Sequence, residues 1–192
     1  MAVYRTALAA LWLLFIVVWV VAAFTAKKNA GGVRSWWRGA GLRFAIIAIL
    51  LMVLRIPILR QGLRHGRAHL FVSDPRVAIA GLIVCAIGIA LAIWARVYLG
   101  SNWGLPMSRK AEPQLVTTGP YAFVRHPIYT GLLLAMVGSA LAESYAWFIS
   151  FVVVGGYFLY SAHAEERLMT ETFPQQYPEY QQHTKMLIPF VL

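Results

Sequence analysis

The feature that most constrains this chain is a long uncharged stretch near its start. No Asp, Glu, Lys or Arg occurs between Thr6 and Ala26. A helix needs about 20 mostly apolar residues to cross a bilayer, whereas the apolar core of a signal peptide has roughly 7–15. Hydrophobic residues make up 60% of the chain and charged residues 12%, against roughly 45–50% and 25% in soluble domains. The stretch therefore predicts a spanning helix, and the composition excludes a soluble globular domain.

Four further stretches predict spanning helices, and the prediction is weak only for the first of them. It is interrupted near its ends by Arg43 and Arg55, which can extend toward the interface, and Pro57 lies near its boundary. Only a helix or a closed barrel satisfies its backbone in lipid. We therefore expect an all-α integral membrane protein, a bundle of about five transmembrane helices. The four stretches are 39–59, 77–95 with an extension to 99, 126–142, and 144–164.

Small residues and short links indicate how these helices pack. Gly81, Cys85 and Gly88 lie on related turns of the third span, which is typical of close helix packing. The residues 142–144 alone separate the last two spans, so these form a tight antiparallel hairpin. A single cysteine excludes an internal disulfide and a Cys/His zinc pattern, and we expect no metal site.

The charge of the chain is typical of a membrane protein on an anionic bilayer. Lys and Arg total 17 against 7 Asp and Glu, a net charge of +10, and the basic residues lie in the links between apolar runs. We therefore expect contact with membrane lipid and none with nucleic acid. The distribution favours an N-terminus outside and a C-terminus in the cytoplasm. The basic loop 55–76 is an unexplained exception to that rule.

A polar cluster precedes the fourth span and predicts an anion site. Arg125 and His126 come directly before Pro127, which suits the first turn of a helix. Helix N-termini attract anions through free N–H groups and the dipole. Tyr129 follows His126 by three residues, on the same helical face. The pattern suggests a pocket for a ligand carboxylate or phosphate, although Arg125 alone could be a topology anchor and Tyr129 an interfacial aromatic.

Two more polar clusters follow in the second half, where all but one of the acidic residues lie. Glu165 and Glu166 come at the end of the fifth span, where a carboxylate at membrane depth indicates function; the alternative is a solvated helix end. Consecutive helical residues point about 100° apart, so one Glu can face a pocket while the other faces Arg or water. Phe173, Tyr177 and Tyr180 form a stripe that could pack an amphipathic tail onto the bundle.

Taken together, these clusters resemble the isoprenylcysteine carboxyl methyltransferase family, and the related phospholipid N-methyltransferases are similar. The motifs are Gly-Pro-Tyr, Arg-His-Pro-x-Tyr-x-Gly, Glu-Glu about forty residues later, Phe-x-x-x-Tyr-x-x-Tyr and a closing Leu-Ile-Pro. The match covers 96–192 and includes the lead-in 99–103. We expect one membrane domain over 1–192, with N-terminal spans in 1–95 and a methyltransferase-like catalytic region in 96–192.

The resemblance implies that the chain uses S-adenosylmethionine. The cofactor would lie between the last two spans and the cytoplasmic segments beside them. Its carboxylate suits the helix start at His126, its ribose hydroxyls or ammonium suit Glu165, and its sulfonium suits Tyr129 or Trp103 through cation–π attraction. Ser161 stands where eukaryotic members carry an Arg implicated in substrate binding. By motif, the cofactor-binding residues are Gln114, Leu115, Val116, Tyr121, His126, Pro127, Ile128, Tyr129 and Glu165.

The expected reaction is methyl transfer to a lipophilic small molecule or lipid-linked acceptor. If the acceptor is a carboxylate, it needs no base, and Arg125 or Arg96 could steer it. If it is a phospholipid amine, it must first lose a proton, and Glu166 is the nearest candidate base. We favour carboxyl methylation, with amine methylation as the alternative. Two other classes stay open: an NADPH-dependent enzyme like the sterol reductases, and a non-catalytic lipid-binding membrane protein.

Overall fold

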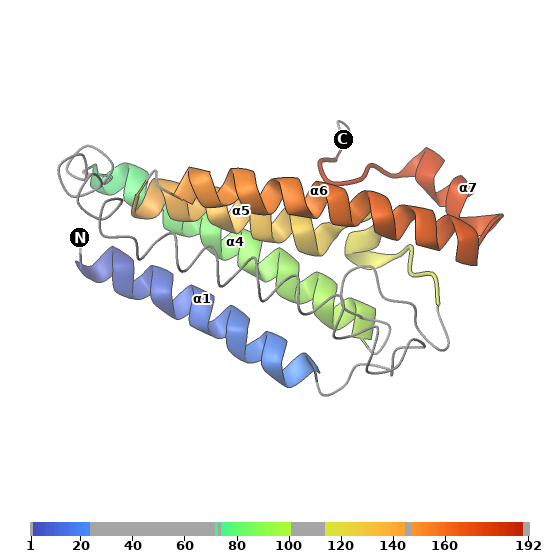
Figure 1. Ribbon diagram of the computed structural model, residues 1–192. Helices are drawn as coiled ribbons and strands as arrows, with labels where there is room; N and C mark the ends of the chain where they lie inside the picture. Colours follow the sequence, from blue (N-terminus) through green and yellow to red (C-terminus); the bar gives the residue numbers. More distant parts are fainter. Residues whose placement is uncertain (1, 24–71, 73, 101–113, 145–146, 190–192) are drawn as a thin grey trace, which may run out of the picture.

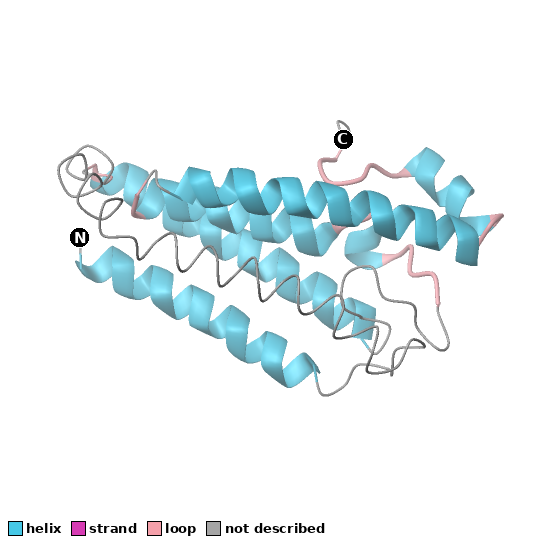
Figure 2. Ribbon diagram, in the orientation of Figure 1, coloured by secondary structure: helices cyan, strands magenta, loops and turns pink. Residues whose placement is uncertain are grey.

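A computed structural model describes residues 2–23, 72, 74–100, 114–144 and 147–189. These residues are helix, turn and coil, with no strand beyond one isolated bridge, as Figure 2 shows. The elements are α1 (Ala2–Ala23), α4 (Pro75–Leu99), the 3-10 helix η3 (Gly119–Ala122), α5 (Pro127–Ala142), α6 (Trp147–Thr172) and α7 (Gln176–His183). The expected all-α class is confirmed.

Three of these helices, α1, α4 and α6, are long and apolar enough to cross a membrane. They correspond to the first, third and fifth spans expected from the sequence. The expected fourth span is α5, which is also apolar but has only 16 residues. The second expected span at 39–59, the basic loop up to residue 71, and Trp103 lie outside the described residues. The chain is therefore a membrane protein built on a helical bundle.

The α4 and α5 helices pack with almost no space between their backbones. A Cβ added to Gly138 would lie 2.2 Å from the backbone nitrogen of Cys85, and one added to Gly88 would lie 2.4 Å from that of Ala135. Real Cβ atoms do not approach other atoms so closely, so glycine is required at both positions. The expected close packing around Gly88 is confirmed, and this helix pair is the centre of the bundle.

The α1 helix is fixed along the bundle by contacts near both its ends. Arg5 Nε lies 3.2 Å from Glu143 Oε1 at the α5–α6 turn. In the first half of the helix, the Trp12 ring stacks on Trp147 at 5.7 Å. At the other end, Arg96 of α4 donates to the backbone oxygen of Ala22. The N-terminal end of α1 therefore lies beside the α5–α6 turn, far from α7, as Figure 1 shows.

The α6 helix continues about two turns past the expected end of the fifth span at residue 164. Glu, Arg, Leu and Met favour helix, and the first proline after them is Pro174. The Glu165–Glu166 pair is therefore held on a regular helix, at the same end of the bundle as the start of α5. The stripe at Tyr177 and Tyr180 belongs to the short helix α7, where Tyr177 is buried.

Candidate active site

The segment that leads into α5 is seated on the end of α4. Gly119 adopts φ of 59°, and a Cβ there would lie 2.6 Å from the Tyr98 ring. The Tyr98 hydroxyl lies 2.7 Å from Thr118 Oγ1. In η3, the buried Tyr121 donates its hydroxyl to the Ala95 oxygen at 3.4 Å, and burial raises its pKa. These contacts fix where α5 begins relative to α4.

The C-terminal strap, which we define as residues 184–187, runs beside the start of α5. Val124 and Lys185 form a parallel bridge. The backbone N–H of Arg125 donates to the Lys185 oxygen at 2.8 Å, and that of His126 donates to the Met186 oxygen at 3.0 Å. The two N–H groups just before the first helical residue, Pro127, therefore bind the strap.

Three rings form a stack at the interface of α5 and α6. The His126 and Tyr129 rings lie 5.5 Å apart with an interplanar angle of 6°. Tyr129 in turn stacks on Phe158 of α6 at 4.4 Å and 10°. This confirms that His126 and Tyr129 share one helical face. The stack presents aromatic surface next to the polar groups of α6.

Glu165 lies at the polar edge of this stack. Its Oε1 accepts hydrogen bonds from the Tyr129 hydroxyl at 2.6 Å and from Ser161 Oγ at 3.2 Å. Its Oε2 lies 3.6 Å from His126 Nδ1. The Ser161 hydroxyl is fully buried and lies 3.2 Å from the Tyr129 hydroxyl. The carboxylate is thus placed by an aromatic residue, a serine and a histidine from two helices.

Glu166 points to a different set of partners. Its Oε1 accepts from Arg125 Nε at 2.6 Å, and its Oε2 accepts from Gln181 Nε2 at 3.0 Å. His126 Nε2 lies 3.4 Å from the same Oε1. The side chains of Arg125 and Glu166 are only 10% and 11% exposed. Apart from His126, which lies near both carboxylates, the two glutamates face different partners, as expected for neighbours on a helix.

Arg125 is held by groups of the protein itself. Besides Glu166, its Nη1 donates to the backbone oxygen of Thr184 and, at 3.4 Å, to that of Gln181. Arg96, the other cation suggested for steering an acceptor, is also buried and donates to the Gly100 oxygen at 3.0 Å. Both arginines therefore join segments of the chain to one another.

The remaining predicted cofactor residues differ in burial, and only Ile128 packs on a residue of this centre. Pro127 is buried, and Ile128 packs on the apolar cluster of Tyr129, Met186 and Leu187. Gln114 is exposed, while Leu115 and Val116 are partly buried ahead of η3. The structure therefore brings Arg125, His126, Tyr129, Glu165 and Glu166 directly together.

Thr130, Phe158 and Gln181 take part in the site but were missed by sequence reasoning. Thr130 lies one helical turn after His126, and Phe158 lies two turns before Glu165, so helical spacing could have indicated them. Nothing in the sequence marks Gln181, because its contacts depend on how α7 folds back.

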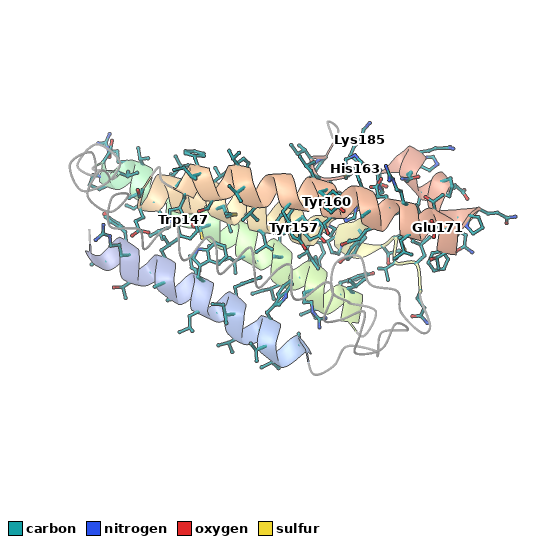
Figure 3. All side chains as sticks on the ribbon, viewed as in Figure 1. Trp147, Tyr157, Tyr160, His163, Glu171 and Lys185 are labelled. Carbon is teal, nitrogen blue, oxygen red and sulfur yellow. The ribbon has the colours of Figure 1, made fainter. Side chains whose placement is uncertain are left out.

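An open groove of about 400 Å³ lies next to Glu166, between the end of α6 and α7. The sequence predicted a pocket between the last two spans and the cytoplasmic segments beside them, and the groove lies along the last of those spans and one such segment. Figure 3 shows His163 and Glu171 along this part of α6, with Lys185 of the strap toward the same end of the molecule. The groove is lined by His163, Glu166, Arg167, Thr170, Glu171 and Gln181.

Comparison with known proteins places these residues in a family. A family model described as phospholipid methyltransferase matches residues 77–176, more than half of the chain. Protein-S-isoprenylcysteine O-methyltransferase A of Arabidopsis thaliana is 30% identical over 151 residues, which cover 77% of this chain and 73% of that protein. The protein-S-isoprenylcysteine O-methyltransferase of Tribolium castaneum is 30% identical over 115 residues, 58% of this chain and 41% of that one.

A solved structure agrees with the sequence relatives. The eukaryotic intramembrane Ras methyltransferase ICMT is 29% identical to the chain and superposes with a TM-score of 0.53, over 60% of this chain and 43% of that one. The chain thus spans less than half the length of the Tribolium castaneum protein and of this solved structure. By the family model and the Arabidopsis thaliana relative, the chain belongs to the family of membrane methyltransferases that comprises the isoprenylcysteine carboxyl and phospholipid methyltransferases.

Proposed function

We propose that this chain is an integral membrane methyltransferase that takes its methyl group from S-adenosylmethionine and transfers it to a carboxylate on a lipophilic acceptor. One observation carries the proposal. The partly buried Glu165 and the buried Ser161 and Tyr129 form a hydrogen-bonded set beside the His126 ring, inside the region that the family model matches. An ionisable side chain at the end of an apolar helix is costly to place there and therefore points to a functional site.

The chemistry of these side chains fits the cofactor. A carboxylate such as that of Glu165 can accept from ribose hydroxyls or an ammonium group. In the aromatic stack the Tyr129 ring is covered by its two neighbours, and the outer faces of His126 and Phe158 can attract a sulfonium through the ring quadrupole. When bound, S-adenosylmethionine supplies an electrophilic methyl group. The residues around Glu165 would bind and orient it, which is most of what an in-line transfer requires.

A carboxylate acceptor suits this site because it requires no proton acceptor. The bond forms between a carboxylate oxygen and the methyl carbon while the carbon–sulfur bond breaks, and its electron pair returns to sulfur. The tyrosines near the site outside the spans, Tyr121, Tyr177 and Tyr180, all have a pKa raised by burial, so they stay protonated at neutral pH. We infer that the site orients the acceptor and excludes water rather than removing a proton.

Amine methylation is the second candidate, and the description of the matching family model, phospholipid methyltransferase, favours it. An amine acceptor must lose a proton before or during transfer. Glu166 is the candidate base expected from the sequence, and its Oε1 already accepts from Arg125 at 2.6 Å. That ion pair opposes a role as base, which is why we place the carboxylate first.

Cofactor binding is tested by calorimetry on the detergent-purified protein. We expect micromolar binding of S-adenosylmethionine and S-adenosylhomocysteine, no binding of NADPH, and loss of binding in His126→Ala and Glu165→Gln. A matched control is Glu179→Gln, an exposed carboxylate on α7. Binding of NADPH in place of the two methionine derivatives would favour the reductase reading, and binding of none of them would refute the proposal.

The acceptor is tested by methyl transfer in membranes. Methyl-labelled S-adenosylmethionine is incubated with the protein and total lipid extract or prenylcysteine derivatives, and the products are treated with mild alkali. A carboxyl methyl ester releases labelled methanol, whereas an N-methyl group is stable. Release of the label supports carboxyl methylation, and stable label in the phospholipid fraction would replace it with the second candidate.

A further inference from the structure

The C-terminal strap reaches the site through backbone bonds and through buried side chains. Besides the two backbone bonds described above, Thr130 Oγ1 donates to the Leu187 oxygen at 2.6 Å. Met186 and Leu187 are 9% and 3% exposed and pack with Tyr129 and Ala162 in one apolar cluster. The strap therefore contacts both helices that carry the candidate site. Its position determines where the backbone of His126 lies.

Arg125 and Glu166 link this strap to the end of α6. Arg125 donates to Glu166 and to the backbone oxygens of Thr184 and Gln181. Gln181 returns a hydrogen bond to the second oxygen of Glu166. The strap, α7, α6 and the start of α5 thus share one network, with the Arg125–Glu166 ion pair at its centre.

We propose that Arg125, Glu166 and Gln181 are positioning residues, which lock the C-terminal strap onto the start of α5 and thereby hold His126 beside Glu165. This assigns to Arg125 and Glu166 a role different from the steering and base roles that the sequence suggested. The inference rests on the proposed function, because the consequence of the lock is measured as cofactor binding.

The burial of the ion pair explains why the lock depends on both partners. Removing one member of a buried pair leaves the other charge uncompensated. With Glu166 neutral, Arg125 would be drawn toward water and would give up its bonds to the Thr184 and Gln181 oxygens. Arg is suited to this position because its rigid group donates to Glu166 from Nε and to the backbone oxygens from Nη1, whereas the three donors of Lys all lie on one nitrogen.

The position of the strap can be measured with a spin label at Lys185→Cys. Lys185 is exposed, and the one native cysteine, Cys85, is 0% exposed, so the label reports on the strap alone. We expect an immobile label in the otherwise wild-type protein and a mobile one in Glu166→Gln. The control Glu179→Gln should leave the label immobile. The spectra are recorded well below the unfolding temperature, so a change in helix stability alone would not alter them.

Cofactor binding by the same variants tests whether the lock serves the site. We expect Glu166→Gln to weaken S-adenosylmethionine binding by about tenfold or more, and Arg125→Lys to give an intermediate loss. If Glu166→Gln does not fold, Thr130→Val provides a second test. It has nearly the same shape, removes the bond to Leu187, and should mobilise the label and weaken binding in the same direction.

The outcomes separate this inference from the proposed function. If the wild-type protein binds no S-adenosylmethionine, the proposed function fails, whatever the label shows. If it binds the cofactor but the label stays immobile in both Glu166→Gln and Thr130→Val, the positioning role is refuted. A mobile label with unchanged cofactor affinity would also refute it, because the strap would then not control the site.

Discussion

The Tyr129 hydroxyl donates to Glu165 Oε1 at 2.6 Å, while its ring lies between His126 and Phe158. Tyr129→Phe keeps the ring stack and removes only this donor. We expect it to weaken S-adenosylmethionine binding by roughly 1.5–3 kcal/mol, the range for a hydrogen bond to a charged group. Calorimetry on the variant measures this. Tyr160→Phe, at a tyrosine 66% exposed on α6, is the matched control, and an equal loss in both would contradict the assignment.

The buried hydroxyl of Tyr180 makes the stability of the folded protein fall at alkaline pH. Burial, partly offset by Thr184, raises the pKa of Tyr180 from 10 to about 12, and its hydroxyl donates to the Tyr121 backbone oxygen. The unfolded chain loses this proton above pH 10 while the folded protein keeps it until about 12. Stability from this group is therefore complete below pH 10 and is lost as the pH rises through this window. We expect stability to decline less steeply with rising pH in Tyr180→Phe than in the wild-type protein, with tyrosinate absorbance reporting the ionisation. An unchanged slope of stability against pH would assign the decline to other groups.

The interface between α4 and α5 leaves no room for a larger side chain at its glycines. A Cβ at Gly138 would lie 2.2 Å from the Cys85 nitrogen and 2.7 Å from its Cα, both backbone atoms. Gly138→Ala is therefore expected to lower the free energy of unfolding by roughly 1–3 kcal/mol, as overpacking does.

At Gly156 of α6 an added Cβ meets no described atom within 4 Å. Gly156→Ala should stabilise the helix by roughly 0.5–1 kcal/mol. Thermal unfolding in detergent that ranked the two variants in the opposite order would refute this account of the packing.

The helices themselves could be predicted because apolar length and proline position are local signals. The α4 and α5 helices begin at Pro75 and Pro127, and proline suits the first turn of a helix. The end of α6 was missed, because hydropathy marks where a span leaves the apolar layer, not where the helix stops. Glu165 and Glu166 continue the helix into polar surroundings without any break in backbone bonding.

At the scale of the whole molecule, the sequence indicated which side chains form the candidate site better than it indicated which backbone contacts hold them in place. His126, Tyr129 and Glu165 could be singled out because charged and titratable residues are unusual beside apolar spans and because the motifs that contain them resemble those of a known family. The strap could not, since its role depends on backbone oxygens such as that of Thr184, 59 residues from Arg125. A carbonyl acceptor is present in every residue and leaves no mark in a sequence. Contacts of that kind follow from the packing of the complete chain.

The basic residues at the two ends of the bundle predict how the protein is oriented in the membrane. The N-terminal end of α1 lies beside the α5–α6 turn, where Arg5 pairs with Glu143. The candidate site and the strap lie at the other end, with Arg96, Arg125 and Lys185. Because Lys and Arg collect on the cytoplasmic side of membrane proteins, we expect the site to face the cytoplasm. A charged, water-soluble cofactor could then reach it directly from that compartment.

Cysteine labelling in intact cells tests this orientation. Val3 is 76% exposed, Lys185 is exposed, and the native Cys85 is buried. A membrane-impermeant maleimide should modify Val3→Cys in intact cells and Lys185→Cys only after the membrane is opened. The reverse pattern would place the site outside the cell, where the cofactor could not reach it directly from the cytoplasm. Labelling of both in intact cells would put the two positions on the same side, which requires an even number of crossings between them and contradicts the five-span count.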